Sequence, residues 1–159
     1  SAASDVYKRQ VKLVVLNSDY GPADDELIKE VENVIDPMPK GKGYGLAPIG
    51  HTVTVVKAEP VPINYTIEVT MTQGHQLAEI KNAIETAIKE RLINRCKEWA
   101  KQDEKQFITV RSSIVTALTV ELPNVLDVGH IQINGQNVPK LELKDNQIPV
   151  MGTINLVAV

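Results

Sequence analysis

Apolar and polar residues alternate most regularly between residues 63 and 71. The apolar positions of this stretch are Ile63, Tyr65, Ile67, Val69 and Met71. A period of two is typical of a strand with one buried face. A shorter alternation, in which Val53 and Val55 alternate with Thr52 and Thr54, precedes it and ends at Pro60 and Pro62. We expect the two strands to pair as an antiparallel hairpin; the alternative is one long strand kinked at residues 59–62.

Three stretches carry apolar residues at helical spacing. In the first, residues 24–35, Asp24 is the expected N-cap, and Pro37 and Pro39 follow the end. The second and longest predicted helix is opened by Gly74, and its apolar stripe consists of Leu77, Ile80, Ile84, Ala87, Ile88, Leu92, Cys96 and Trp99. For the third, Ser112 is the expected cap and the apolar face carries Ile114, Val115, Leu118 and Leu122.

The remaining apolar runs predict strands at residues 11–16, at 107–110 and within 125–159, where Asn134-Gly135 is the strongest short hairpin signal. The element order is β-α-β-β-α-(β)-α-β-β-β. This order predicts an α+β fold of mainly antiparallel or mixed sheets with helices packed on one face. We expect two small lobes, residues 11–73 and 74–159. Residues 1–10 show no periodicity, and we treat them as an unstructured remnant at the end of the sequence.

Composition narrows the class of protein. Of the 159 residues, 43% are hydrophobic and 23% are charged, which is typical of an ordinary soluble domain. The net charge of −3 argues against a nucleic-acid partner, because such binders present basic surfaces to the phosphates. No apolar run approaches the roughly 18 residues of a membrane span, so we expect no membrane insertion. The single cysteine excludes an internal disulfide framework.

The residues that could carry chemistry form no recognisable constellation. His51, His75 and His130 lack a second ligand at a metal spacing, so we read them as surface or turn residues. Cys96 lies on the apolar stripe of a helix, which favours a buried small hydrophobe over a nucleophile. The other candidates are Ser112-Ser113, which lack a nucleophile elbow, and the acidic groups Asp24-Asp25-Glu26 and Asp103-Glu104, which are read as solvated charge at helix ends. We therefore expect a protein that is not an enzyme.

Residues 40–50, with the sequence KGKGYGLAPIG, form a glycine-rich loop. Backbone N–H groups of such a loop, together with Lys40 and Lys42, are one way to hold a phosphate or small ligand. A phosphate-binding loop, however, has its lysine after the glycines and leads into a helix. Here the lysines come first and a strand follows, so a structural loop is favoured. A module that binds a phosphate or small ligand remains the alternative function.

At this loop the chain resembles a known family. Residues Gly43, Tyr44, Gly45, Leu46, Ala47, Pro48, Ile49 and Gly50 are similar to the signature segment of the baseplate J family, wedge proteins of Mu-like contractile phage tails. The strand, turn and helix over residues 11–36, the long helix after Gly74, the segment 122–128 and the segment 148–154 are similar in order and spacing. Asn124 departs from the pattern, since the family often has glycine there. Family members are usually longer, so we expect the C-terminal portion of such a protein.

The resemblance implies a structural part of a baseplate wedge in a phage tail, prophage or related injection machine. It implies that partners are other copies of the chain and other baseplate wedge, hub or tail proteins, and that no cofactor, metal or catalytic residue is needed. The location it implies is the virion tail baseplate, assembled in the cytoplasm of the bacterial host. Within the signature, Tyr44 is one of few aromatic residues, and interfaces are enriched in tyrosine. We therefore expect Gly43, Tyr44, Gly45, Ala47, Pro48, Ile49 and Gly50 to form an assembly surface.

Overall fold

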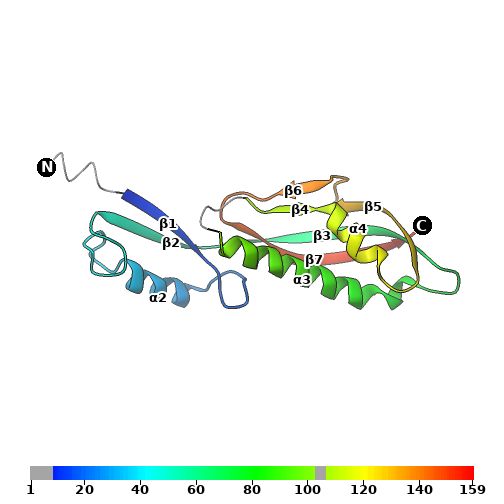
Figure 1. Ribbon diagram of the computed structural model, residues 1–159, viewed down its shortest axis with the longest axis horizontal. Helices are drawn as coiled ribbons and strands as arrows, with labels where there is room; N and C mark the ends of the chain where they lie inside the picture. Colours follow the sequence, from blue (N-terminus) through cyan, green and yellow to red (C-terminus); the bar gives the residue numbers. More distant parts are fainter. Residues whose placement is uncertain (1–8, 103–106) are drawn as a thin grey trace. The chain divides into compact units, whose positions relative to one another are not determined.

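The structure is a computed structural model that describes residues 9–102 and 107–159. Its described elements, three α-helices and seven strands, follow the predicted order and form an α+β fold (Figure 1). The chain divides into two compact units between Glu59 and Pro60. We had expected the boundary near Gln73, with the strand at residues 63–71 in the first lobe. None of the helices in the described part of the chain has the length and apolar character of a membrane span.

The N-terminal unit is a strand–helix–strand arrangement of β1 (Arg9–Val15), α2 (Asp25–Ile35) and β2 (His51–Lys57). The strands pair in parallel, with Val11 opposite Val53, because the helical crossover returns the chain in the same direction. Asp24 caps α2 as predicted, since its side chain accepts a hydrogen bond from the Leu27 N–H. The core of this unit consists of Ala47, Val53 and Val55, packed against Leu13, Val15, Ile28, Val31 and Ile35.

The predicted hairpin between the two alternating strands is wrong. β2 pairs with β1, whereas β3 (Glu59–Met71) lies between β5 and β7 in a separate sheet. The two strands follow each other with only Ala58 between them, so the chain stays extended where we expected a turn. The prolines near residue 60 do not reverse the chain, because proline is tolerated at the start of a strand.

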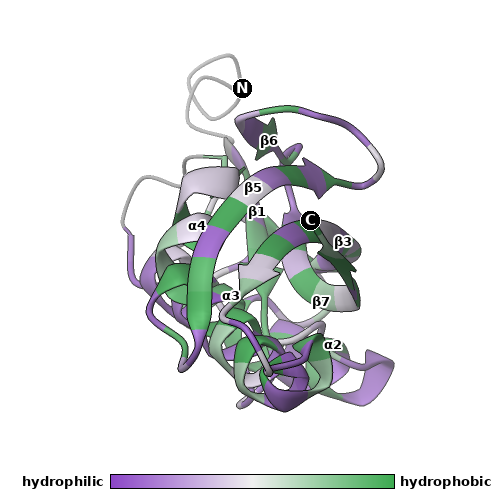
Figure 2. Ribbon diagram, turned by 90° about the vertical axis from the view of Figure 1, so that its right-hand side faces the viewer, coloured by the Kyte–Doolittle hydropathy of each residue, from purple (hydrophilic) through white to green (hydrophobic). Residues whose placement is uncertain are grey.

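The C-terminal unit is built on the three-stranded sheet β5-β3-β7, formed with β5 (Val125–Ile133) and β7 (Gln147–Ala158). β5 pairs antiparallel with β3. The Thr153 N–H donates to the Asn64 side-chain oxygen, and the Val159 N–H donates to the Val69 carbonyl. Residue numbers rise in the same direction on both strands, so β7 runs parallel to β3. Hydrophobic and hydrophilic residues alternate along β5 (Figure 2). The sheet is therefore mixed, with β3 as its central strand. The predicted inward positions of β3 are buried as expected: Ile63, Tyr65, Ile67 and Val69.

The longest helix packs on this sheet against β7 (Figure 1). It begins as a short 3-10 turn, η1 (Leu77–Glu79), and continues as α3 (Lys81–Ala100), so it starts a few residues after Gly74. The stripe residues Ile84, Ile88, Leu92, Cys96 and Trp99 are buried as predicted. Their spacing places them on one side of the helix.

Two short strands, β4 (Thr109–Arg111) and β6 (Lys140–Glu142), pair antiparallel beside α4 (Ser112–Val120). The expectation that Ser112 caps α4 is wrong. Arg111 occupies the N-cap position, and the Ser112 hydroxyl instead donates to the Pro139 carbonyl at 3.2 Å. A distant segment therefore captures the hydroxyl that local sequence would have assigned to the helix end.

The turn residues behave as their side chains allow. Asn134 and Gly135 have φ of 51° and 76°, and Ile133 and Gln136 exchange both backbone hydrogen bonds across them, as predicted for a tight turn. The expectation that the strands on the two sides of this turn form a hairpin is wrong, because β6 pairs with β4 and β5 pairs with β3. Asn124, where the resembling family often has glycine, has φ of 64°. Asparagine tolerates this left-handed conformation better than most other residues.

Candidate functional site

The base of the glycine-rich loop is held by a buried carboxylate. Asp36 follows α2 directly, and its two oxygens accept hydrogen bonds from the backbone N–H groups of Gly41 and Val53, both at 2.9 Å. The bonds from Val53 and Gly41 hold the pKa of Asp36 below its ordinary value. The neighbouring Lys40 ammonium donates to the Val53 carbonyl at 2.8 Å. One anionic side chain thus joins the start of the loop to the strand that follows it.

A second attachment joins the middle of the loop to the end of α2. The N–H groups of Leu46 and Ala47 donate to the Val34 and Ile35 carbonyls at 3.0 and 2.8 Å. These carbonyls belong to the last turn of the helix, where no intrahelical partner is available. Gly45 makes the approach possible, because a Cβ at this position would lie 2.5 Å from the Val34 oxygen and 2.6 Å from the Ile35 oxygen.

Three glycines give the loop its course. Gly41, Gly43 and Gly50 have φ of 76°, 73° and 87°, in the region that side chains other than glycine rarely adopt. The Gly50 N–H donates to the Gly41 carbonyl at 2.9 Å and closes the loop at its base. The glycines of the predicted signature therefore have conformational and packing roles. Pro48 lies next to the buried Ala47, and its carbonyl accepts from the His51 N–H.

The loop and the adjoining end of α2 expose a group of large apolar side chains, which we call the apolar tip. Its members and their exposed fractions are Val34 (56%), Met38 (79%), Tyr44 (71%), Leu46 (74%) and Ile49 (78%). They are five of the twelve exposed large apolar residues in the described part of the chain, so exposure is concentrated on this short segment. Such concentration is typical of interaction surfaces, whereas isolated exposed apolar residues are ordinary.

The same geometry bears on the alternative of a phosphate site. The loop N–H groups of Gly41, Leu46, Ala47 and Gly50 are already bonded within the chain. The Asp36 carboxylate occupies the position in which an external anion would meet the Gly41 N–H, and it would repel one. The Lys40 ammonium is bonded to the Val53 carbonyl at the base of the loop. The loop is therefore built around its own anion, the Asp36 carboxylate, which argues against a phosphate site there.

The other predicted candidates do not converge. His75 lies 3.2 Å from Glu79 and His130 lies 3.6 Å from Glu68, both at the surface, while His51 lies at the start of β2. Within residues 9–102 and 107–159, no three His, Cys, Asp or Glu side chains gather in a way that would hold a metal ion. Ser112 begins α4 and Asp24 caps α2. The acidic pair Asp103-Glu104 lies outside the described residues.

Cys96 is buried, as its position in the helical stripe predicts. Its thiol lies 3.6 Å from the Pro149 carbonyl, to which it donates. Burial raises the pKa of the thiol to about 11, although the nearby Arg95 lowers it. A thiol in this state is protonated near neutral pH, which is typical of a packing residue.

Sequence reasoning overlooked Asp36. It falls only at the end of the family-like segment 11–36, yet it is the group that fixes the loop. A usable signal was present: an acidic residue stands between the apolar stripe of a helix and a proline. Such a residue is at a helix end, from which a short side chain reaches nearby backbone N–H groups.

A scan of the sequence against protein families finds no match. Two known proteins of Bacillus subtilis (strain 168) are similar to the chain. The phage-like element PBSX protein XkdT is 36% identical over 147 residues, and the uncharacterized protein YqbT is 35% identical over 147 residues; each alignment covers 92% of this chain. The chain spans 39% of the length of each relative.

Proposed function

We propose that this chain is a structural part of a phage-derived particle, and more specifically of the baseplate wedge of a contractile tail or tail-like injection machine. It acts there by protein–protein assembly, with no catalytic turnover and no bound cofactor. Its partners are other copies of itself and other baseplate or tail proteins. It is assembled in the cytoplasm of the bacterial host and resides in the tail baseplate.

The observation that carries the proposal is the similarity to the PBSX protein XkdT across 92% of the chain, since that protein belongs to a phage-like element. The baseplate assignment rests on the resemblance of residues 43–50 and their surroundings to the baseplate J family. The apolar tip supports an assembly role, because aromatic and aliphatic side chains presented on a fixed loop are typical of interface centres.

Within this proposal the apolar tip is the contact surface, and Tyr44 is its central anchor. Replacing Tyr44 by alanine removes a largely exposed ring, so the free energy of unfolding is expected to change by no more than about 0.5 kcal/mol. Incorporation of the protein into particles is expected to fall strongly, because truncation of an interface tyrosine commonly costs about 2 kcal/mol or more of binding free energy.

The test is made in the complete gene product, expressed in the bacterium that carries the gene. Particles are purified by sedimentation, and the amount of the protein in them is measured by quantitative mass spectrometry. Leu126→Ala is the matched control, because Leu126 is 65% exposed in β5 and lies outside the tip. If deletion of the gene leaves intact tails, or if the protein never co-sediments with tail components, the baseplate role is wrong. If Y44A and L126A particles are equally complete, the tip is not the contact surface.

A further inference from the structure

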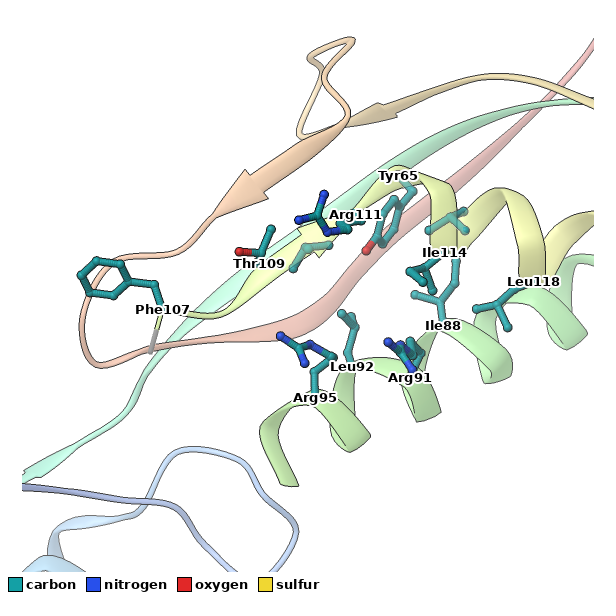
Figure 3. Close-up of a pocket in the computed structure, with 12 residues that line it drawn as sticks. Tyr65, Ile88, Arg91, Leu92, Arg95, Phe107, Thr109, Arg111, Ile114 and Leu118 are labelled. Carbon is teal, nitrogen blue, oxygen red and sulfur yellow. The ribbon is translucent and has the colours of Figure 1, made fainter. Parts of the chain in front are cut away.

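The C-terminal unit contains a cavity of about 310 Å³ between α3, β4 and α4. Its apolar lining is formed largely by residues from the core, with Tyr65, Ile88, Leu92, Val110 and Val115 all buried. Ile114 and Leu118 of α4 line another side and are partly exposed (Figure 3). The volume is at the lower end of those that hold ligands in proteins, and it suits one or two amino-acid side chains.

Three arginines surround this cavity. Arg91 and Arg95 lie one turn apart on α3, and Arg111 lines the cavity on the opposite side, at the junction of β4 and α4 (Figure 3). Arg95 lies 3.1 Å from Glu98 of its own helix. Arg91 and Arg111 form no ion pair with any acidic side chain that the structure describes. We call this feature the arginine-rimmed cavity.

The charge around the cavity is opposite to that of the whole chain. Among the residues that the structure describes, twelve line the cavity, and they include three arginines and no aspartate or glutamate, while the chain has a net charge of −3. Like charges spaced four residues apart on a helix disfavour the folded state slightly. A positive rim around a low-dielectric floor also attracts anions. The described contacts within the chain do not balance the positive charge of this cluster. An external anion would reduce the repulsion among the arginines.

The lining also specifies which anion fits. A guanidinium matches a carboxylate or a phosphate with two parallel hydrogen bonds, so the choice between anions falls to the rest of the lining. The Tyr65 hydroxyl points into the cavity (Figure 3) and is a further donor, since burial raises the pKa of Tyr65 to about 12 and keeps it protonated. The apolar floor, in contrast, would leave a small hydrated ion without contacts. A ligand that combines a carboxylate with an aliphatic group uses both parts of the lining.

We propose that the arginine-rimmed cavity binds an acidic peptide segment of a partner protein, which inserts an aliphatic side chain over Tyr65 and Leu92 and places a carboxylate against the arginines of the rim. Glutamate beside leucine, isoleucine or valine is the expected local sequence. The inference concerns binding chemistry alone, and it holds or fails independently of the baseplate role.

The test uses the 159-residue chain and a labelled pentapeptide of alternating glutamate and leucine, with binding followed by fluorescence anisotropy. The peptide is expected to bind saturably, and the affinity is expected to fall as salt is raised, because charged contacts are screened. A peptide with glutamine in place of glutamate is expected to bind at least about tenfold more weakly. The double variant R91Q/R111Q is expected to lose a similar factor.

Lys89→Gln is the matched control, because it removes one positive charge from the exposed side of the same helix and is expected to leave binding unchanged. Circular dichroism verifies that each variant is folded. Ile114→Phe provides an independent arm: it narrows the cavity without altering charge, and it is expected to weaken binding of the glutamate peptide.

Four results would overturn the proposal. The first is no saturation with the glutamate peptide up to about 1 mM, and the second is equal binding of the glutamate and glutamine peptides. The third is that R91Q/R111Q binds the peptide as tightly as the parent chain does. The fourth is that inorganic phosphate displaces the peptide as well as unlabelled peptide does, which would indicate a site for small anions. Self-association of the chain that R91Q/R111Q abolishes would instead identify a second copy as the occupant.

Discussion

Replacing Gly45 by alanine tests how the loop that carries the apolar tip is fixed. The new methyl group would lie 2.5 Å from the Val34 oxygen, 2.6 Å from the Ile35 oxygen and 2.7 Å from the Pro37 ring. These atoms belong to the backbone and to a proline ring, so they cannot move aside as a flexible side chain would. The middle of the loop must therefore withdraw from the end of α2.

The cost follows from the bonds that the withdrawal breaks. The N–H groups of Leu46 and Ala47 would lose their acceptors on α2. Each such bond contributes about 0.5–1.5 kcal/mol net, so the local stability of the loop is expected to fall by about 1–3 kcal/mol. Because 1 kcal/mol is a factor of about five in an equilibrium constant, the loop is expected to open about 5- to 150-fold more often.

Amide hydrogen exchange followed by mass spectrometry measures this opening directly. Peptides that cover residues 44–55 are expected to exchange faster in G45A, while peptides from α3 keep their rates. Gly21→Ala is the matched control, because the nearest atom to its new Cβ is the Asn17 side-chain nitrogen at an ordinary 3.4 Å. Exchange of residues 44–55 at the parent rate in G45A, or acceleration to the same extent in G21A, would refute the account of Gly45.

Two further predictions concern ionisable groups. The folded-state pKa of Asp36 lies below its ordinary value of 3.8, so its contribution to stability is present above about pH 4 and is lost as pH falls further, when the unfolded chain binds a proton first. Asp36→Asn, which turns an NH2 toward one of the two N–H donors, is expected to lower the urea midpoint of the N-terminal unit and to flatten its dependence on pH in this range; an unchanged pH profile would contradict the role given to the carboxylate. The pKa of Cys96 of about 11 predicts that the folded chain reacts with Ellman's reagent at pH 8 about two orders of magnitude more slowly than the unfolded chain, and equal rates would show that the thiol is accessible and ionised.

The parts of the fold that were predictable depend on local sequence. The period-two alternation around Ile67, the apolar stripe of α3, the Asp24 cap and the Asn134-Gly135 turn each follow from neighbouring residues, and each is present. The pairing of strands is not local. β2 and β3 are both half-buried alternating strands, so the pattern fixes the face that each one buries and leaves its neighbours open.

One correction was within reach of the sequence. The order strand, helix, strand over residues 9–57 is the arrangement that produces a parallel pair with a crossover helix. The prolines at 60 and 62 directed attention to a hairpin with the next strand instead. The Ser112 cap, by comparison, could not have been corrected, because its competitor, the Pro139 carbonyl, is 27 residues away.

For the candidate site, the glycine positions were predictable and the groups around them were not. Left-handed glycines at 41, 43 and 50 follow from the composition of the loop. The role of Asp36 depends on two N–H groups that only the folded loop brings together. Arg91, Arg95 and Arg111 line one cavity because α3 and the β4–α4 junction are adjacent in space. Their sequence positions, two in a helix and one at the end of a strand, carry no such signal.

The loop separates the residues that hold it from the residues that it displays. Asp36, Gly45 and Ala47 are bonded or packed against α2 and β2, whereas Tyr44 and Ile49 are largely exposed. Changes at the exposed positions therefore alter recognition with little effect on folding, while changes at the held positions alter both. The apolar tip and the arginine-rimmed cavity, one in each unit of this chain, differ in chemistry, since one is aliphatic and aromatic and the other carries positive charge. The two proposed contacts are therefore separable: Y44A is expected to disable the first alone, and R91Q/R111Q the second alone.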